Sequence, residues 1–142
     1  MKAGLMLRIA AVFTLLYCAG HTSGMPWTPS LRPQDIDLIQ SMKSNPFEVF
    51  GSVRTYWDTY FGFGIAISCF LAVQAVVLWL LAPFANEGAR PIRIIIAAFL
   101  IAFVANAIIS WAYFFWPPVM FAVAISVCLA VALVLVPKTK SA

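Results

Sequence analysis

A stretch of eleven residues, RTYWDTYFGFG at positions 54–64, combines two opposite charges, four aromatic residues between positions 56 and 61 and two glycines. Arg54 and Asp58 stand four apart, so a helix would place them on one face. If the apolar runs of the chain are membrane-spanning helices, counting the rise along each of them brings a set of polar residues to one height in the outer leaflet. The set is His21, Arg54, Asp58, Asn106 and Ser110. An imidazole and a carboxylate at one depth can exchange a proton or bind a polar lipid headgroup.

The same region has a simpler interpretation as the aromatic belt of a membrane protein, in which Arg54 and Asp58 form an ion pair that sets the height of the helix. The aromatic residues predicted to lie at an interface are Trp27, Tyr56, Trp57, Tyr60, Trp111 and Trp116. Both interpretations stay open from the sequence. From the helix geometry we predict that Asp58 faces into a bundle of membrane helices. Gly62 and Ala66 lie on the same helix face as Asp58 and are small enough for close helix packing.

The amino-acid composition indicates that most of the chain lies in a lipid bilayer rather than in water. Of 142 residues, 63% are hydrophobic and 10% are charged, whereas a soluble domain carries about 25% charged residues. So few charges cannot cover a water-facing surface, and the bilayer must surround most of the chain. The net charge of +4 does not indicate nucleic-acid binding, because the charges flank apolar runs and form no basic stripe.

Four apolar runs predict four membrane spans. Their ranges are about 3–22, 54–84, 91–115 and 119–136, within a single domain of residues 1–142. The last two are divided at Trp116-Pro117-Pro118, because proline cannot continue a helix. The predicted fold is all-α, an antiparallel four-helix bundle with short connections.

The first outward loop carries the main polar segment. Residues 33–43 have Ile36, Ile39 and Met42 on one side and a proline at the start, which predicts a short amphipathic helix. Asn45-Pro46 should end it. An ordinary ordered loop is the alternative.

The first apolar run has two interpretations. Lys2 and Arg8 could form the basic start of a signal peptide whose small residues near Gly20 resemble a cleavage site. The run is also long enough to span a bilayer, with Arg8 reaching to the inner interface. We expect a retained helix.

Charge asymmetry predicts the orientation. One side carries Lys2, Arg8, Arg90, Arg93, Lys138 and Lys140, and the other carries Arg32, Lys43 and Arg54. The positive-inside rule then places both termini in the cytoplasm.

Other site types are not indicated. Cys18, Cys69 and Cys128 all lie inside apolar runs, so we interpret them as packing residues. One histidine without a cysteine or carboxylate cluster argues against a metal, and the sequence has no phosphate-binding glycine motif, so no cofactor is predicted. Small residues four apart predict helix-packing seams. The three stripes are Gly64, Ser68 and Ala72; Ala98, Ala102, Asn106 and Ser110; and Ala122, Ser126 and Ala130.

Two motifs carry a resemblance. GHTxGxPW at positions 20–27 and RxYWDxYxGFG at positions 54–64 resemble a group of small bacterial inner-membrane proteins with four predicted spans. The resemblance covers nearly the whole chain and implies location and topology, but no reaction. A looser similarity to sterol-isomerase-type bundles rests on size and polar residue types and has no matching motif.

The leading functional hypothesis is a non-enzymatic integral membrane protein that binds a lipid or a membrane partner at its outer-leaflet face. The partner would be membrane lipid, another membrane protein or a second copy, and not nucleic acid. The alternative is an isomerase-like membrane enzyme that uses Asp58 and His21 as base and acid on a lipid-soluble substrate. A transporter is disfavoured, because the spans hold few central polar groups.

Overall fold

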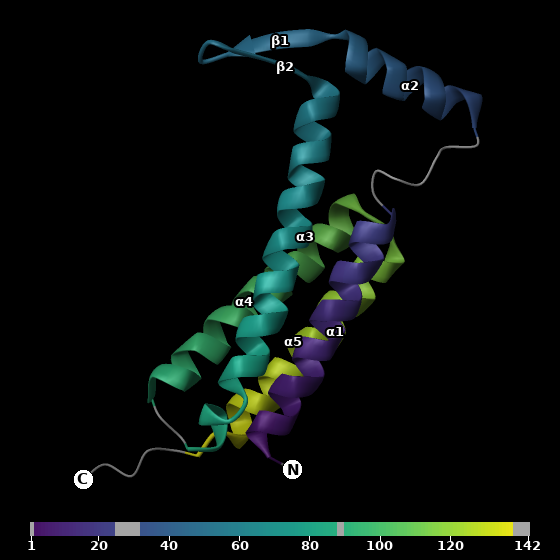
Figure 1. The fold of residues 1–142 in the computed structure, drawn as a ribbon. Coiled ribbons are helices and arrows are strands. Elements are labelled where there is room, and N and C mark those ends of the chain that lie inside the picture. The colour runs from purple at the N-terminus through teal and green to yellow at the C-terminus, as the bar shows by residue number, and fades with distance from the viewer. Residues whose placement is uncertain (1, 25–31, 88–89, 138–142) are drawn as a thin grey trace. The chain divides into compact units, whose positions relative to one another are not determined.

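The computed structural model describes residues 2–24, 32–87 and 90–137 of the chain (Figure 1). Its elements are α1 (Ala3–Gly24), α2 (Pro33–Ser44), β1 (Pro46–Val49), β2 (Ser52–Thr55), α3 (Tyr56–Leu81), the short 3-10 helix η1 (Phe84–Asn86), α4 (Arg90–Tyr113) and α5 (Trp116–Leu135). Four of them, α1, α3, α4 and α5, are long and apolar enough to cross a membrane. They indicate a multi-pass membrane protein, and they lie where the four spans were predicted.

Contacts divide the chain into two compact units. Unit 1 consists of Met1–Tyr17 and Leu71–Ala142, and unit 2 of Cys18–Phe70. Both α1 and α3 therefore contribute one part to each unit.

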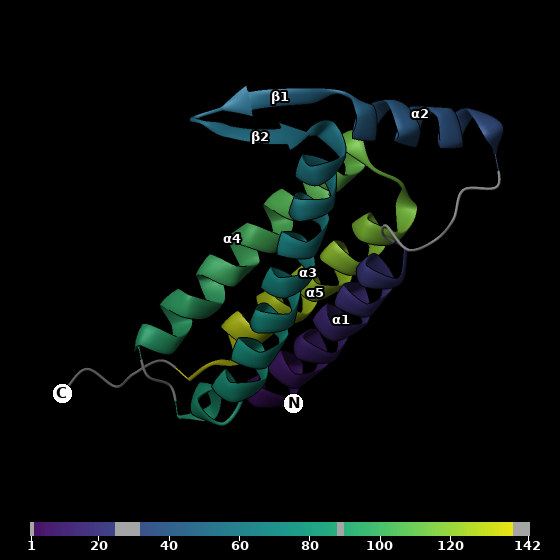
Figure 2. The same ribbon diagram turned by 45° about the horizontal axis from the view of Figure 1, so that its top comes forward.

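The core of unit 1 is a dry contact between helices. Leu7, Leu78, Ile96, Ile125 and Leu129 are completely buried, and they come from all four long helices. In Figures 1 and 2, α1 and α5 lie side by side, in agreement with the Tyr17 ring stacked on Phe121 at 5.5 Å. Large apolar side chains also cover the outside of this unit, which is the surface that lipid tails solvate.

Helix ends in unit 1 are closed by side chains from other elements. The backbone N–H of Gly4 in the first turn of α1 donates to Asn86 Oδ1 at 3.1 Å. Arg93 Nη1 donates to the carbonyl of Val136, just past α5, at 2.8 Å. Both bonds satisfy backbone groups that a helix leaves unpaired. They also bring the starts of α1 and α4 and the end of α5 to one end of unit 1. We call it the basic end, because Lys2, Arg8, Arg90 and Arg93 lie at or near it.

The break between α4 and α5 lies earlier than predicted. Phe115 is extended, α5 begins at Trp116, and prolines occupy its first turn. A proline there is compatible with a helix, because the N–H that it lacks would have no intrahelical partner. Pro117 and Pro118 therefore begin α5, and the expectation that they form the connection was wrong.

Unit 2 contains the one clear departure from an all-α fold in the described residues. α2 forms as predicted and ends before Asn45. It is followed by an antiparallel hairpin of β1 and β2, in which Phe47 pairs with Arg54 and Val49 with Ser52. The predicted second span therefore starts too early, because residues 54 and 55 belong to β2. Phe50 and Gly51 make the turn with φ of 49° and 75°.

Each of the three predicted small-residue seams is buried in part. Ala122 and Ser126 are buried on α5, and Gly64 is buried on α3. On α4, Ala98 and Ala102 are exposed. Ser110 of the predicted seam is buried there, together with Ile96 and Phe103. These three lie seven apart, the spacing that returns to one helix face after two turns.

Candidate functional site

The Asp58 carboxylate closes the start of α3. Its Oδ2 accepts the backbone N–H of Thr55 at 2.8 Å and the Thr55 hydroxyl at 2.9 Å. In return, the backbone N–H of Asp58 donates to Thr55 Oγ1 at 3.1 Å. This reciprocal pair is a capping box, which satisfies backbone donors at a helix start. The sequence signature Thr-x-x-Asp was present at positions 55–58 and could have been recognised.

The interpretation of Asp58 as a desolvated group facing the bundle was wrong. Asp58 is exposed, and its carboxylate bonds to Thr55 rather than to His21 or Asn106. The height-setting ion pair is also absent, since within residues 32–87 Arg54 and Asp58 do not approach to salt-bridge distance. The Arg54 guanidinium instead donates to the carbonyl of Val53 at 2.7 Å.

A second group of polar side chains and backbone carbonyls joins the end of α1 to α3 within unit 2. We call it the polar seam, and its residues are Cys18, His21, Thr22, Gly64 and Ser68. The Cys18 thiol donates to the Ser68 carbonyl at 3.3 Å. The Thr22 and Ser68 hydroxyl oxygens are 2.8 Å apart. Each helix contributes residues three or four apart, so one face of α1 meets one face of α3.

The Thr22 and Ser68 hydroxyls of the polar seam can be arranged as hydrogen-bond donor and acceptor in two ways. Thr22 Oγ1 lies 2.7 Å from the Cys18 carbonyl, and Ser68 Oγ lies 3.3 Å from the Gly64 carbonyl. Each hydroxyl has one proton. Ser68 can donate to Thr22 while Thr22 donates to the Cys18 carbonyl, or Thr22 can donate to Ser68 while Ser68 donates to the Gly64 carbonyl.

His21 has a fixed tautomer in this seam. Its Nε2 lies 3.1 Å from the Gly64 carbonyl. A carbonyl oxygen only accepts, so Nε2 must carry the proton. In the neutral ring Nδ1 is then the acceptor nitrogen. The imidazole thus acts as a donor that ties α1 to α3.

Asn106 and Ser110 meet in unit 1. The Ser110 hydroxyl donates to Asn106 Oδ1 at 3.3 Å, and the Tyr17 hydroxyl donates to the same oxygen at 3.3 Å. Ser110 is buried. The sequence placed Asn106 and Ser110 together because they are four apart. It did not place Tyr17 with them, since that contact joins α1 to α4.

The predicted five-residue cluster is therefore distributed over separate structures. Asp58 belongs to the capping box, Arg54 to the hairpin, and His21 to the polar seam. Asn106 and Ser110 bond to each other in the other unit. Sequence reasoning missed Thr22, although Gly64 and Ser68 were predicted as a seam on one face of the second span, and Cys18 and His21, three apart, lie close to one face of α1. What it lacked was the rotation that turns these two faces toward each other.

Aromatic contacts organise unit 2. Tyr56 packs against Phe47 at 5.0 Å, which joins the hairpin to α3. Lys43 Nζ lies 4.8 Å from the centre of the Trp57 ring, which joins α2 to α3. Trp57 also contacts Tyr60 at 5.7 Å. These contacts hold α2 and the hairpin against the start of α3.

The remaining predicted belt residues are only partly described. Trp111 and Trp116 form an edge-on pair at 5.3 Å across the break between α4 and α5 in unit 1, and both are exposed. Trp27 lies outside the described residues.

Metal ligation has no candidate group within the described ranges, where three or more His, Cys, Asp or Glu side chains do not gather. Comparison with known proteins adds no further guide to the site: the chain matches no protein-family model, no curated protein and no solved structure. Functional inference therefore rests on the residues themselves.

Proposed function

We propose that this chain is a non-enzymatic protein of the bacterial inner membrane that binds a membrane protein partner at its outer face. The observation that carries the proposal is the tip of the β1–β2 hairpin. Phe50 is fully exposed there, and its backbone is left-handed, with φ of 49°. A non-glycine residue in this conformation costs about 1–2 kcal/mol. A strained turn that presents an aromatic ring to the outside suits recognition better than stability.

The distribution of apolar residues around the tip favours a protein over a lipid surface. Side chains alternate between the two faces of a strand. Phe47 and Val49 therefore share one face of the hairpin, whereas Val53, paired with Glu48, lies on the other. Val49 and Val53 are 47% and 62% exposed. A flat bilayer can cover only one of these faces, but a pocket in a partner can enclose the tip from both sides.

The hairpin is also held in place before any partner arrives. The Phe47–Tyr56 contact and the capping box attach it to the start of α3. A binding element that is ordered in advance loses less entropy when it binds. Asp58 closes the start of α3 through the capping box. The Nε2 proton of His21 is donated to the Gly64 carbonyl. Because both side chains have these structural partners, we do not propose the acid–base enzyme.

The same proposal includes an antiparallel four-helix bundle with both termini in the cytoplasm. It is supported by the basic end of unit 1, where positive charge should face the cytoplasm. Lys138 and Lys140 of the predicted inner cluster lie outside the described residues. A reporter active only outside the cytoplasm should work when inserted at Ser44 and fail when fused after Lys140. Activity at the second position would contradict this orientation.

Photo-crosslinking tests the partner. Benzoylphenylalanine in place of Phe50 should give a discrete protein adduct in intact membranes, and the same probe in place of the exposed Gln40 on α2 should not. Val53→Ser should weaken the adduct, because it removes apolar surface beside the tip. Ile36→Ser is the matched control, since Ile36 is 56% exposed and Val53 is 62% exposed.

The mass of the adduct separates the alternatives. A distinct membrane protein supports the proposal. Adducts with lipid alone, or an adduct of twice the mass of this chain, would contradict it and assign the tip to the bilayer or to a second copy.

A further inference from the structure

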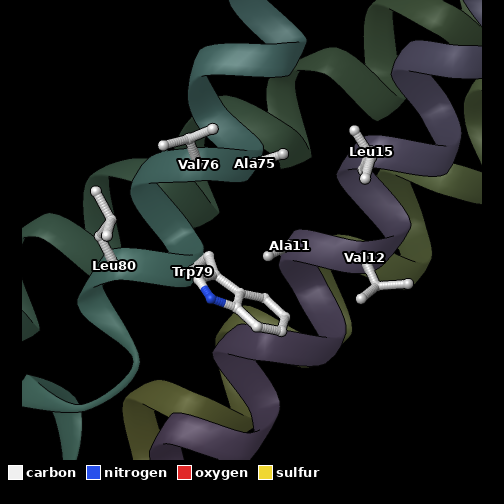
Figure 3. Close-up of a pocket in the computed structure, with 7 residues that line it drawn as sticks. All are labelled: Ala11, Val12, Leu15, Ala75, Val76, Trp79 and Leu80. Carbon is white, nitrogen blue, oxygen red and sulfur yellow. The ribbon is translucent and has the colours of Figure 1, made fainter.

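An apolar groove opens on the side of unit 1 between α1 and the last turns of α3. Its volume is about 230 Å³. Val12 and Leu15 line one wall, and Val76 and Leu80 line the other. Figure 3 shows the Trp79 indole reaching from α3 toward α1 beside Ala11. The small side chains of Ala11 and Ala75 leave the space that the larger ones border.

One cation stands at one end of this groove. Arg8 lies one helical turn before Ala11 and Val12, on the same face of α1. Its guanidinium carbon is 5.5 Å from the centre of the Trp79 ring. This contact is electrostatic and consumes no N–H donor. Arg8 is exposed, and in the described part of the chain it forms no ion pair. Its donors can therefore meet an anion that comes from outside the protein.

The groove is oriented along the helices. Gly4 of α1 bonds to Asn86 beyond α3, so Arg8 and Trp79 lie toward the basic end. Leu15 and Val76 lie further from it along their helices. A charged site at the basic end followed by an apolar groove matches the arrangement of a phospholipid, whose headgroup lies at the interface and whose tail points to the bilayer centre.

We propose that this groove holds one acyl chain of an anionic membrane lipid and that Arg8 binds its phosphate. Arg is suited to phosphate because its planar fork can donate two parallel hydrogen bonds. Trp79 holds the guanidinium at the mouth of the groove. The site lies in unit 1 and is independent of the hairpin tip, so either proposal can fail without the other.

Native mass spectrometry tests the site with defined lipids. The protein is purified in mild detergent and incubated with equal amounts of phosphatidylglycerol and phosphatidylcholine. The wild type should retain one phosphatidylglycerol in preference to phosphatidylcholine. Arg8→Gln should reduce that retention roughly tenfold, because glutamine keeps one neutral donor group and loses one of the two charge-assisted hydrogen bonds. Arg8→Lys should retain an intermediate amount. Arg90→Gln removes a different cation at the basic end and should change retention little.

A second pair of variants tests the groove itself. Val76→Trp should fill the groove and lower retention, whereas Val73→Trp should not. The two sites match in exposure, 58% for Val76 and 60% for Val73, and both lie on α3. The melting temperature of each variant reports that the protein is still folded. Equal retention of both lipids by the wild type, unchanged retention in Arg8→Gln, or equal behaviour of the two tryptophan variants would overturn the proposal.

Discussion

Unit 1 and unit 2 use polar groups differently. In unit 1, Asn86 and Arg93 close helix ends, and the buried hydroxyls of Thr14 and Ser126 turn back onto their own helices. In unit 2, Thr22 bonds to Ser68 across a helix interface, and the hairpin exposes Phe50. The Tyr17 hydroxyl also bonds to Asn106 Oδ1 between two helices of unit 1, whose core is otherwise mainly apolar. Unit 1 is thus held together mainly by apolar contact, whereas unit 2 carries the polar seam and the exposed hairpin tip.

The largest expected effect tests the close packing of unit 1. Gly4→Ala places a methyl group against the carbonyl of Ala82, a backbone atom that cannot move aside cheaply. Overpacking of this kind costs about 1–3 kcal/mol. Gly20→Ala is the matched control in the same helix, because its added methyl group meets nothing within 4 Å. Thermal unfolding in detergent should show a clear loss for the first variant and none for the second. Equal melting temperatures of the Gly4→Ala and Gly20→Ala variants would refute the close approach of α1 to the Ala82 carbonyl.

A cavity in the core of unit 1 should have the next largest effect. Leu7 is completely buried, whereas Leu5 is 50% exposed. Leu7→Ala should cost about 2 kcal/mol, the low end for such truncations, since lipid is as apolar as the core and only packing is lost. Leu5→Ala should cost little. A similar loss for both would mean that α1 has no inward face.

Because α1 is buried in this way, the intact mass should also correspond to a chain that keeps it, and a chain beginning near His21 would show a cleaved signal peptide.

The polar seam of unit 2 should be weaker. Ser68→Ala removes the hydroxyl that meets Thr22, and interhelical hydrogen bonds in membranes contribute about 0.6–1.7 kcal/mol. Cys69→Ala is the neighbouring control on an exposed position. Unfolding in a denaturing detergent should separate the two variants by about this amount. If they unfold alike, the seam does not hold α1 to α3.

The capping box should show the smallest and most local effect. Thr55→Ala removes a helix cap, at about 1 kcal/mol. Asp58→Asn keeps an acceptor oxygen for the Thr55 N–H and should change global stability little. Hydrogen exchange at the first turn of α3 should be faster in the first variant and nearly unchanged in the second. Severe misfolding of Asp58→Asn would show that its carboxylate has a buried partner after all.

The sequence predicted the long helices because their length and lack of charge leave no other structure in a bilayer. It missed the hairpin for a local reason. Two-residue hairpin turns are usually signalled by Asn-Gly or Asp-Gly, whereas here the first turn position is Phe50. It also misjudged Pro117 and Pro118, since proline breaks a helix only in its interior.

The candidate site was predictable only where contacts are local. Asn106 and Ser110 are four apart, and Thr55 and Asp58 are three apart, so helix periodicity alone brings each pair together. The pairing of Cys18 with Ser68 depends on how two helices rotate about their own axes. Those helices are apolar nearly all round, so the sequence pattern carries little information about that rotation.

The bond between Gly4 and Asn86 also has a consequence for biosynthesis. The chain is made from its N-terminus, so α1 enters the membrane before its capping partner has been synthesised. Until Asn86 emerges, the N–H of Gly4 must remain at the wet interface or bond to something else. The first turn of α1 can therefore be completed only after α3, the second of the four long helices, has been made, and a nascent chain halted before residue 86 should leave α1 accessible to the insertion machinery.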